Sequence, residues 1–121
     1  MPCFVGVCAR YLQRMGSPSW IAEEQVVFVH PDGHRESGRI AVGLPFRFDA
    51  LECRCSVALD GLEKVTVPIR GDSPLQALLL SLQLLGFRLH EFVTRGGRVL
   101  TADGDELPLS AFFGPLLRAA A

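Results

Sequence analysis

The stretch GDSPLQALLLSLQLLGF, residues 71–87, decides the fold. Ser73 is suited to capping a helix, and Pro74 to its first position, where a missing backbone N–H costs nothing. Gln76 stands three residues after Ser73, which is the spacing of a capping box. Together with the leucines that follow at helical spacing, this start predicts one long helix over residues 73–92.

The leucines of this helix point in two directions. When residues are placed about 100° apart, Leu80, Leu84 and Phe87 fall on one side, beside Gln76 and Gln83. The opposite, broader face is expected to meet a sheet. It carries Leu75, Leu78, Leu79, Leu82, Leu85 and Leu89.

The smaller apolar set needs a cover, because a helix that is apolar all round is normally buried all round. Each fully buried Leu or Phe side chain contributes about 1.5–3 kcal/mol. One possible cover is the C-terminal segment of the chain, or the N-terminal CFVGVC, residues 3–8. The other is a separate protein molecule, either a different protein or a second copy. In that case Leu80, Leu84, Phe87 and Gln83 form a partner-binding surface.

Strand patterns fill the first half of the chain. Residues 26–30 gather β-branched and aromatic side chains, and HPDGH, residues 30–34, has the Pro, Asp and Gly of a tight turn. The next strand, about residues 35–42, is expected to return antiparallel and to complete a hairpin.

Residues 51–59 are predicted to form a strand with one buried and one wet face. Leu, Cys, Cys, Val and Leu occupy its odd positions, and Glu, Arg, Ser and Ala its even positions. The DGLE turn, residues 60–63, leads into a further alternating strand over residues 64–70. Pro68 places this last strand at a sheet edge or at a bulge, because proline donates no ladder hydrogen bond.

Smaller elements are expected at the end of the chain. RVLTADGDE, residues 98–106, predicts a short strand and a turn, and residues 107–121 predict helical pieces interrupted at Gly114 and Pro115. A run of strands followed by a helix indicates an α+β fold. We expect an antiparallel sheet of about four to five strands, with the long helix packed across one face and short C-terminal helical pieces.

Composition limits the classes of function. A length of 121 residues with 49% hydrophobic content suits a single domain over residues 1–121. The net charge of -1 comes from mixed signs, so the basic patch of a nucleic-acid binder is missing and no nucleic-acid partner is expected. The N-terminus has no basic region before its apolar run. The apolar run of residues 75–87 is interrupted by polar side chains and is too short for a membrane span. We therefore predict a cytoplasmic protein that does not enter a membrane.

The cysteines invite a metal interpretation. Cys53 and Cys55 would be two ligands, with Cys3 and Cys8 as further ones. However, positions two apart on a strand share one face, and a buried free cysteine behaves as a small apolar residue. The spacings also differ from those of common zinc knuckles. We predict core thiols and no metal site.

The HPDGH turn is the alternative place for chemistry. His30, Asp32 and His34 have the side chains of a small metal or acid–base cluster. However, Pro-Asp-Gly is ordinary turn chemistry, and a solvated turn is the simpler explanation. The TRGGR segment, residues 94–98, is similarly interpreted as a helix terminator rather than an anion-binding nest. No nucleophile elbow, P-loop or dinucleotide fingerprint is present, so the sequence predicts no catalytic residue and no cofactor.

Three segments resemble an uncharacterised family of small bacterial proteins, in which a G-x-D-S-x-Q-A-L-like helix start follows a strand pair. They are RIAVGLP (39–45), ECRCSVAL (52–59) and IRGDSPLQALLLSLQLL (69–85), and the resemblance covers residues 26–92. It implies no established activity. By analogy, small bacterial proteins of this build resemble immunity or antitoxin partners that are encoded beside a toxin.

The sequence therefore favours a non-enzymatic protein-binding module of the immunity or accessory type. Its partner would be another protein, or a second copy in a homodimer. The alternative is a small enzyme or a ligand- or metal-binding domain that uses the His30, Asp32 and His34 turn.

Overall fold

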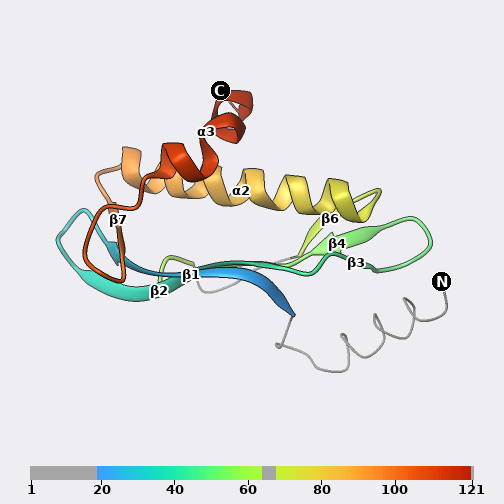
Figure 1. Ribbon diagram of the computed structural model, residues 1–121, viewed down its shortest axis with the longest axis horizontal. Helices are drawn as coiled ribbons and strands as arrows, with labels where there is room; N and C mark the ends of the chain where they lie inside the picture. Colours follow the sequence, from blue (N-terminus) through green and yellow to red (C-terminus); the bar gives the residue numbers. More distant parts are fainter. Residues whose placement is uncertain (1–18, 64–67, 121) are drawn as a thin grey trace.

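Two antiparallel sheets and two helices make up the part of the chain that the computed structural model describes, residues 19–63 and 68–120 (Figure 1). The α+β class is therefore confirmed. The strands are β1 (Trp20–Val29), β2 (Arg35–Gly43), β3 (Phe46–Arg47), β4 (Cys53–Cys55), β5 (Val57–Asp60), β6 (Ile69–Gly71) and β7 (Arg98–Thr101), and the helices are α2 (Pro74–Thr94) and α3 (Leu109–Ala120).

The larger sheet has the strand order β5-β2-β1-β7. Its centre is the predicted hairpin, because β1 and β2 pair antiparallel along their length. The turn between them needs Gly33, whose φ of 92° lies in the left-handed region that favours glycine. β1 begins six residues earlier than the sequence pattern indicated, at Trp20 instead of Val26. Its first half lacks apolar alternation and is a strand because it pairs with β2.

The larger sheet has the predicted number of strands, but a second, smaller sheet with the order β3-β4-β6 was not expected. The predicted strand over residues 51–59 is also wrong as a single element. It is divided at Ser56 into β4 and β5, which belong to different sheets. Ser56 and Ala58 were expected on a wet face, yet both are buried. The chain changes sheets at Ser56, so the alternation of one strand does not continue into the next.

The predicted strand over residues 64–70 is described only from Pro68 onward. Residues 64–67 lie outside the described part of the chain, so their half of the prediction stays a prediction. β6, Ile69–Gly71, pairs antiparallel with β4 at one side of the smaller sheet. Pro68 directly precedes this strand, where it interrupts no ladder.

The start of α2 follows the predicted capping pattern with one change. The Ser73 hydroxyl accepts a hydrogen bond from the Gln76 backbone N–H at 3.1 Å. The Gln76 side-chain oxygen accepts from the Asp72 backbone N–H at 2.6 Å, one residue before the position that a capping box uses. α2 ends two residues later than predicted, at Thr94.

The end of α2 confirms the prediction that TRGGR terminates the helix. The Gly96 N–H donates to the Val93 carbonyl, and the Gly97 N–H donates to the Phe92 carbonyl. These two bonds are a Schellman motif, and the Gly96 φ of 101° supplies the left-handed residue that it requires.

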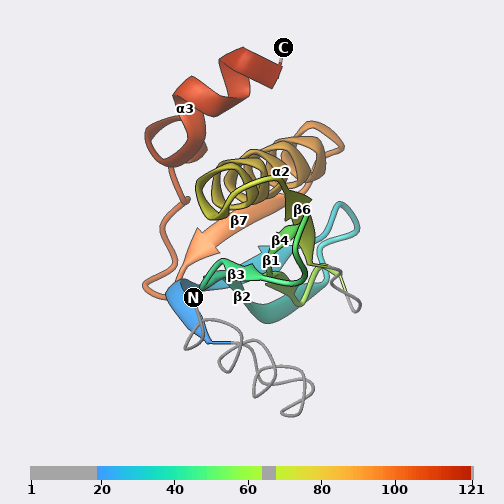
Figure 2. The same ribbon diagram turned by 90° about the vertical axis from the view of Figure 1, so that its right-hand side faces the viewer.

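α2 lies across one face of the sheets, and the core forms between them (Figures 1 and 2). Its first turns approach β6 closely, since a Cβ on Gly71 would lie 2.6 Å from the Ala77 nitrogen. The largest fully buried side chains include Phe28 from β1 and Leu89 from α2. The N-terminal part of α2 thus packs on the smaller sheet, and its C-terminal part packs on the larger sheet.

α3 is one helix, Leu109–Ala120, so the predicted interruption at Gly114 and Pro115 is wrong. It meets α2 at Gly86, where an added Cβ would lie 3.0 Å from the Cβ of Phe113. Beyond this crossing, α3 leads away from α2 (Figure 2). Tertiary contact at its first half holds the helix, and a single proline in a short helix removes only one backbone hydrogen bond.

Candidate functional site

The side of α2 that faces away from the sheets carries large apolar side chains. Leu75 is 65% exposed, Leu79 45%, Leu80 39% and Phe87 49%. No charged residue occurs from Pro74 to Phe87. We call Leu75, Leu79, Leu80 and Phe87, with Gln76 and Gln83 between them, the outer face of α2.

The predicted partner-binding residues are divided between this face and the core. Leu80 and Phe87 are exposed as expected. Leu84 is partly buried and packs against the core, and Gln83 is half-buried. Leu80 and Phe87 are therefore the predicted residues that a partner reaches most directly.

The predicted sheet-facing set is partly wrong. Leu85 and Leu89 are buried, but Leu75 and Leu79 point away from the sheets. Leu78 and Leu82 are partly buried against the core, as expected. The fully buried residues in the first half of α2 are Ala77 and Ser81. Their small side chains allow the helix to approach the strands, so the buried line is rotated relative to the line of leucines.

The protein's own C-terminal segment covers a different side of α2. α3 packs where Gly86 leaves room for Phe113, and Leu80 and Phe87 stay exposed beside it. The other proposed cover, CFVGVC, lies outside the described residues. Among the described residues, therefore, no segment buries the outer face of α2.

The HPDGH turn is built as a turn. The Asp32 carboxylate accepts the His34 backbone N–H at 2.8 Å. The His30 ring stacks edge-on against Phe92, with centroids 5.4 Å apart, and its Nε2 lies 3.8 Å from the Glu36 carboxylate. The described residues contain no group of three His, Cys, Asp or Glu side chains placed to hold a metal ion. His30 and Asp32 thus contact the turn and its neighbours Phe92 and Glu36, and the alternative function that uses this turn stays a prediction.

Cys53 and Cys55 are fully buried free thiols, as predicted. The Cys55 thiol lies 3.3 Å from the Gly43 carbonyl, to which it donates. Burial raises the pKa of Cys55. A protonated, inaccessible thiol is a poor nucleophile, so this position offers packing rather than reactivity. Cys3 and Cys8 lie outside the described residues.

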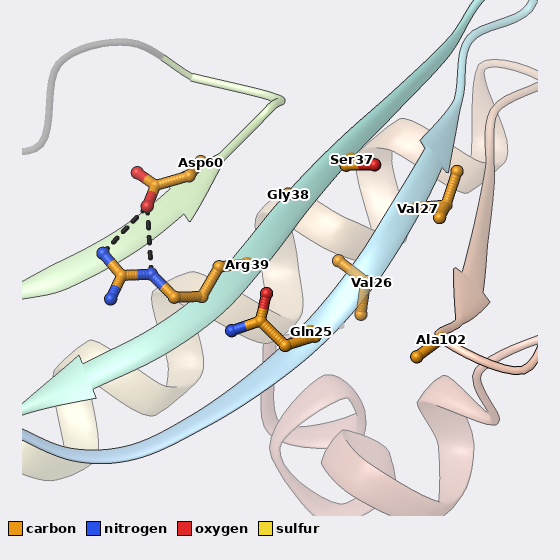
Figure 3. A pocket seen from close by; sticks show the side chains of 8 residues that line it. All are labelled: Gln25, Val26, Val27, Ser37, Gly38, Arg39, Asp60 and Ala102. Atoms are coloured by element: carbon orange, nitrogen blue, oxygen red, sulfur yellow. Dashed lines mark hydrogen bonds and ion pairs between the residues drawn. The ribbon is translucent and has the colours of Figure 1, made fainter.

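A hollow of about 470 Å³ lies on the face of the larger sheet away from α2 (Figure 3). Its floor includes Gly38, and its charged lining residues are Arg39 and Asp60. The Arg39 guanidinium binds the Asp60 carboxylate at 2.8 Å and that of Glu23 at 3.1 Å. Both charged lining residues are thus paired within the sheet, and the described residues present no unpaired ionic group to a ligand in this hollow.

α2 is the helix of the described part that is long and apolar enough to cross a membrane by length and composition, although part of it is buried in the fold. This differs from the expectation that the apolar run is too short. Length and composition alone do not distinguish a membrane-spanning helix from a core helix of a globular fold. Ala77, Ser81, Leu85 and Leu89 all contact the rest of the protein.

The open edge of β1 was not predicted from the sequence. The first half of β1, before Val26, has an edge that no described strand covers. Because the pattern of residues 20–25 shows no apolar alternation, the strand was expected to begin later. The glutamates at positions 23 and 24 were the available signal, since charged side chains are common on exposed edges.

Comparison with protein-family models, curated proteins and solved structures gives no match for this chain. The family resemblance of residues 26–92 therefore stays a prediction.

Proposed function

We propose that this protein is a non-enzymatic protein-binding module, of the immunity or accessory type, and that its docking surface is the outer face of α2. The exposure of Leu75, Leu79, Leu80 and Phe87 along one uncharged helix face carries the proposal. Exposed apolar patches on small proteins commonly mark interaction sites.

The chemistry of the face defines the partner. Leucine and phenylalanine require an apolar surface, and Gln76 and Gln83 add amide donors and acceptors without charge. The partner surface is therefore uncharged and apolar, with a few polar groups for the two amides. A groove that receives a protruding helix has this chemistry.

A different protein fits better than a second copy. The face from Pro74 to Phe87 is roughly 20 Å long and 10 Å wide. Two identical helices that cross contact each other over only part of that area. Stable interfaces bury about 800 Å² on each partner. A groove that receives the helix and also contacts the surface beside it comes closer to this area than a crossing of two convex faces.

A comparison of charge insertions tests this proposal. Phe87→Arg and Leu80→Arg place a charge in the docking surface, whereas Leu51→Arg places one on a loop residue that is already 85% exposed. Proteins retained by the wild-type and Leu51→Arg chains, but lost with both α2 variants, are candidate partners. Their purified forms should bind the α2 variants at least about thirtyfold more weakly, the loss of a hot-spot residue. A partner that binds all four chains equally would refute the assignment.

Two further measurements distinguish the other possible occupants of the outer face of α2, a second copy of the chain and a membrane. A mass in solution equal to one chain is expected, and a dimer that Phe87→Arg dissociates would assign the face to a second copy. Co-sedimentation with phospholipid vesicles is expected to fail, because surface-bound helices usually flank their apolar side with Lys and Arg. Vesicle binding lost in the Phe87→Arg variant would assign the face to a membrane instead.

A further inference from the structure

The edge of β1 is the second unpartnered surface of the described residues. β1 pairs with β2 from Trp20 to Val29, with a shift in register between Trp20 and Ala22, but with β7 only from Val26 to Val29. On the β7 side, the edge from Trp20 to Gln25 therefore has no described strand beside it. An open edge of this kind accepts a further strand by backbone pairing.

The direction of the backbone groups follows from the pairing with β7. The Val99 carbonyl accepts the Leu107 N–H on the far side of β7, so the next residue, Leu100, is the one that bonds to β1. Leu100 stands opposite Val27. Because bonding direction alternates along a strand, Glu23 presents its N–H and C=O to the same side as Val27, where the edge is open.

An apolar groove lies beneath this edge. It has a volume of about 250 Å³ and runs between the strands, α2 and α3. Its apolar lining is Ile40, Val42, Leu82, Leu85, Phe112 and Phe113. Small-molecule pockets are usually about 300–1,000 Å³, so a smaller groove beside an open strand suits one or two side chains of an added strand.

The charges near this edge indicate which polar side chains an added strand would carry. Glu24 lines the groove, and it is exposed with no ion pair among the described residues. Glu23 points to the other face, where it already binds Arg39. The Glu24 carboxylate favours an added strand that carries Lys or Arg. It disfavours a second copy, because pairing two β1 edges would bring glutamates of both chains together.

We propose that the Trp20–Gln25 edge of β1 is an acceptor site for an extended peptide segment of apolar and basic residues. The segment pairs with the Glu23 backbone, inserts apolar side chains into the groove and places a cation beside Glu24. This site is separate from the outer face of α2, so either assignment can fail without the other.

Labelled seven-residue peptides and the full chain provide the test, read by fluorescence anisotropy. A peptide of alternating Leu and Lys is expected to bind. An alternating Leu and Glu peptide should bind at least tenfold more weakly, and a Leu and Lys peptide with a central Pro, which cannot complete the ladder, should not bind. Glu24→Lys should reverse the preference between the Lys and Glu peptides.

Glu23→Pro tests the backbone contact. The Glu23 N–H, which proline removes, points to the open edge. The β1–β2 ladder therefore keeps its hydrogen bonds, while the added strand loses one. Peptide binding is expected to disappear, and Glu23→Gln, which removes the charge but keeps the N–H, is the matched control and should bind. Hydrogen–deuterium exchange of the wild-type chain provides a measurement without substitutions. The Glu23 amide hydrogen should exchange at least tenfold more slowly when the peptide is bound.

Three results would overturn the proposal. One is that none of the peptides binds. Another is that the peptide binds the folded Glu23→Pro variant as tightly as the wild type, or that bound peptide does not slow exchange of the Glu23 amide. Either result places the peptide elsewhere. The third is a dimer in solution that Glu23→Pro dissociates, since this result gives the edge to a second copy.

Discussion

The two sides of α2 reverse the usual arrangement of an amphipathic helix. In the first half of the helix, the fully buried side chains are Ala77 and Ser81, whereas Leu75, Leu79 and Leu80 face outward. Leu78, Leu82 and Leu84 are only partly buried against the core, and full burial of large apolar residues begins at Leu85. Size as well as polarity therefore decides which side of this helix is buried.

Close packing at the smaller sheet explains the reversal. Ala77 meets Gly71 of β6, where neither position has space for a larger side chain. Ser81 is buried but satisfied, because its hydroxyl donates to the Ala77 carbonyl at 2.7 Å. A leucine at either position would push the helix away from β4 and β6. The apolar residues displaced from this interface form the surface that we assign to a partner.

The largest predicted difference between the two sides comes from a matched pair of truncations. Leu89→Ala removes a fully buried side chain, and the free energy of unfolding should fall by about 2–5 kcal/mol. Leu79→Ala makes the same change on the outer face and should alter it by less than about 0.5 kcal/mol. Urea denaturation measures both values. Equal losses would show that the outer face is covered within the isolated chain.

A smaller effect is expected where α3 crosses α2. Gly86→Leu places a side chain where even a Cβ would lie 3.0 Å from the Phe113 Cβ. Overpacking of this kind costs about 1–3 kcal/mol, despite the better helix propensity of leucine, and urea denaturation measures the loss.

A double-mutant cycle supplies the control for Gly86→Leu. Phe113→Ala should be less destabilising in the Gly86→Leu chain than in the wild type, because it relieves the crowding. If the two substitutions are simply additive, α3 does not rest on Gly86 in solution.

The sequence predicts the fold best where local chemistry decides it. Ser73 and Gln76 mark the start of α2, and the turn at residues 30–34 defines the hairpin, because capping and turn formation depend on neighbouring residues. The division at Ser56 could not be predicted in this way. The pattern on both sides of Ser56 suits one strand, and only tertiary pairing assigns its halves to different sheets.

The candidate sites, too, could be predicted only where neighbouring residues decide the structure. Leu80 and Phe87 were correctly expected on the side away from the sheet, because helical spacing determines direction along a regular element. Leu75 and Leu79 were not, since the rotation of α2 on the sheets depends on Gly71 of a different element. The open edge of β1 was missed because strand formation at residues 20–25 comes from pairing with β2 and not from their own pattern.

The smallest predicted effect is a pH dependence that originates beneath the inner side of α2. Burial raises the pKa of Cys55 above its ordinary value of 9.0, so the folded protein keeps a proton that the unfolded chain releases in alkali. The stabilisation is complete below the unfolded pKa and is lost as the pH rises through the folded pKa. The free energy of unfolding, measured in urea between about pH 8 and pH 10, should fall with rising pH, and the fall should be shallower in Cys55→Ala, which has no thiol to ionise there. An identical slope in the two proteins would mean that the thiol reaches water when α2 is in place, and that the close contact between small residues and strands does not exclude solvent.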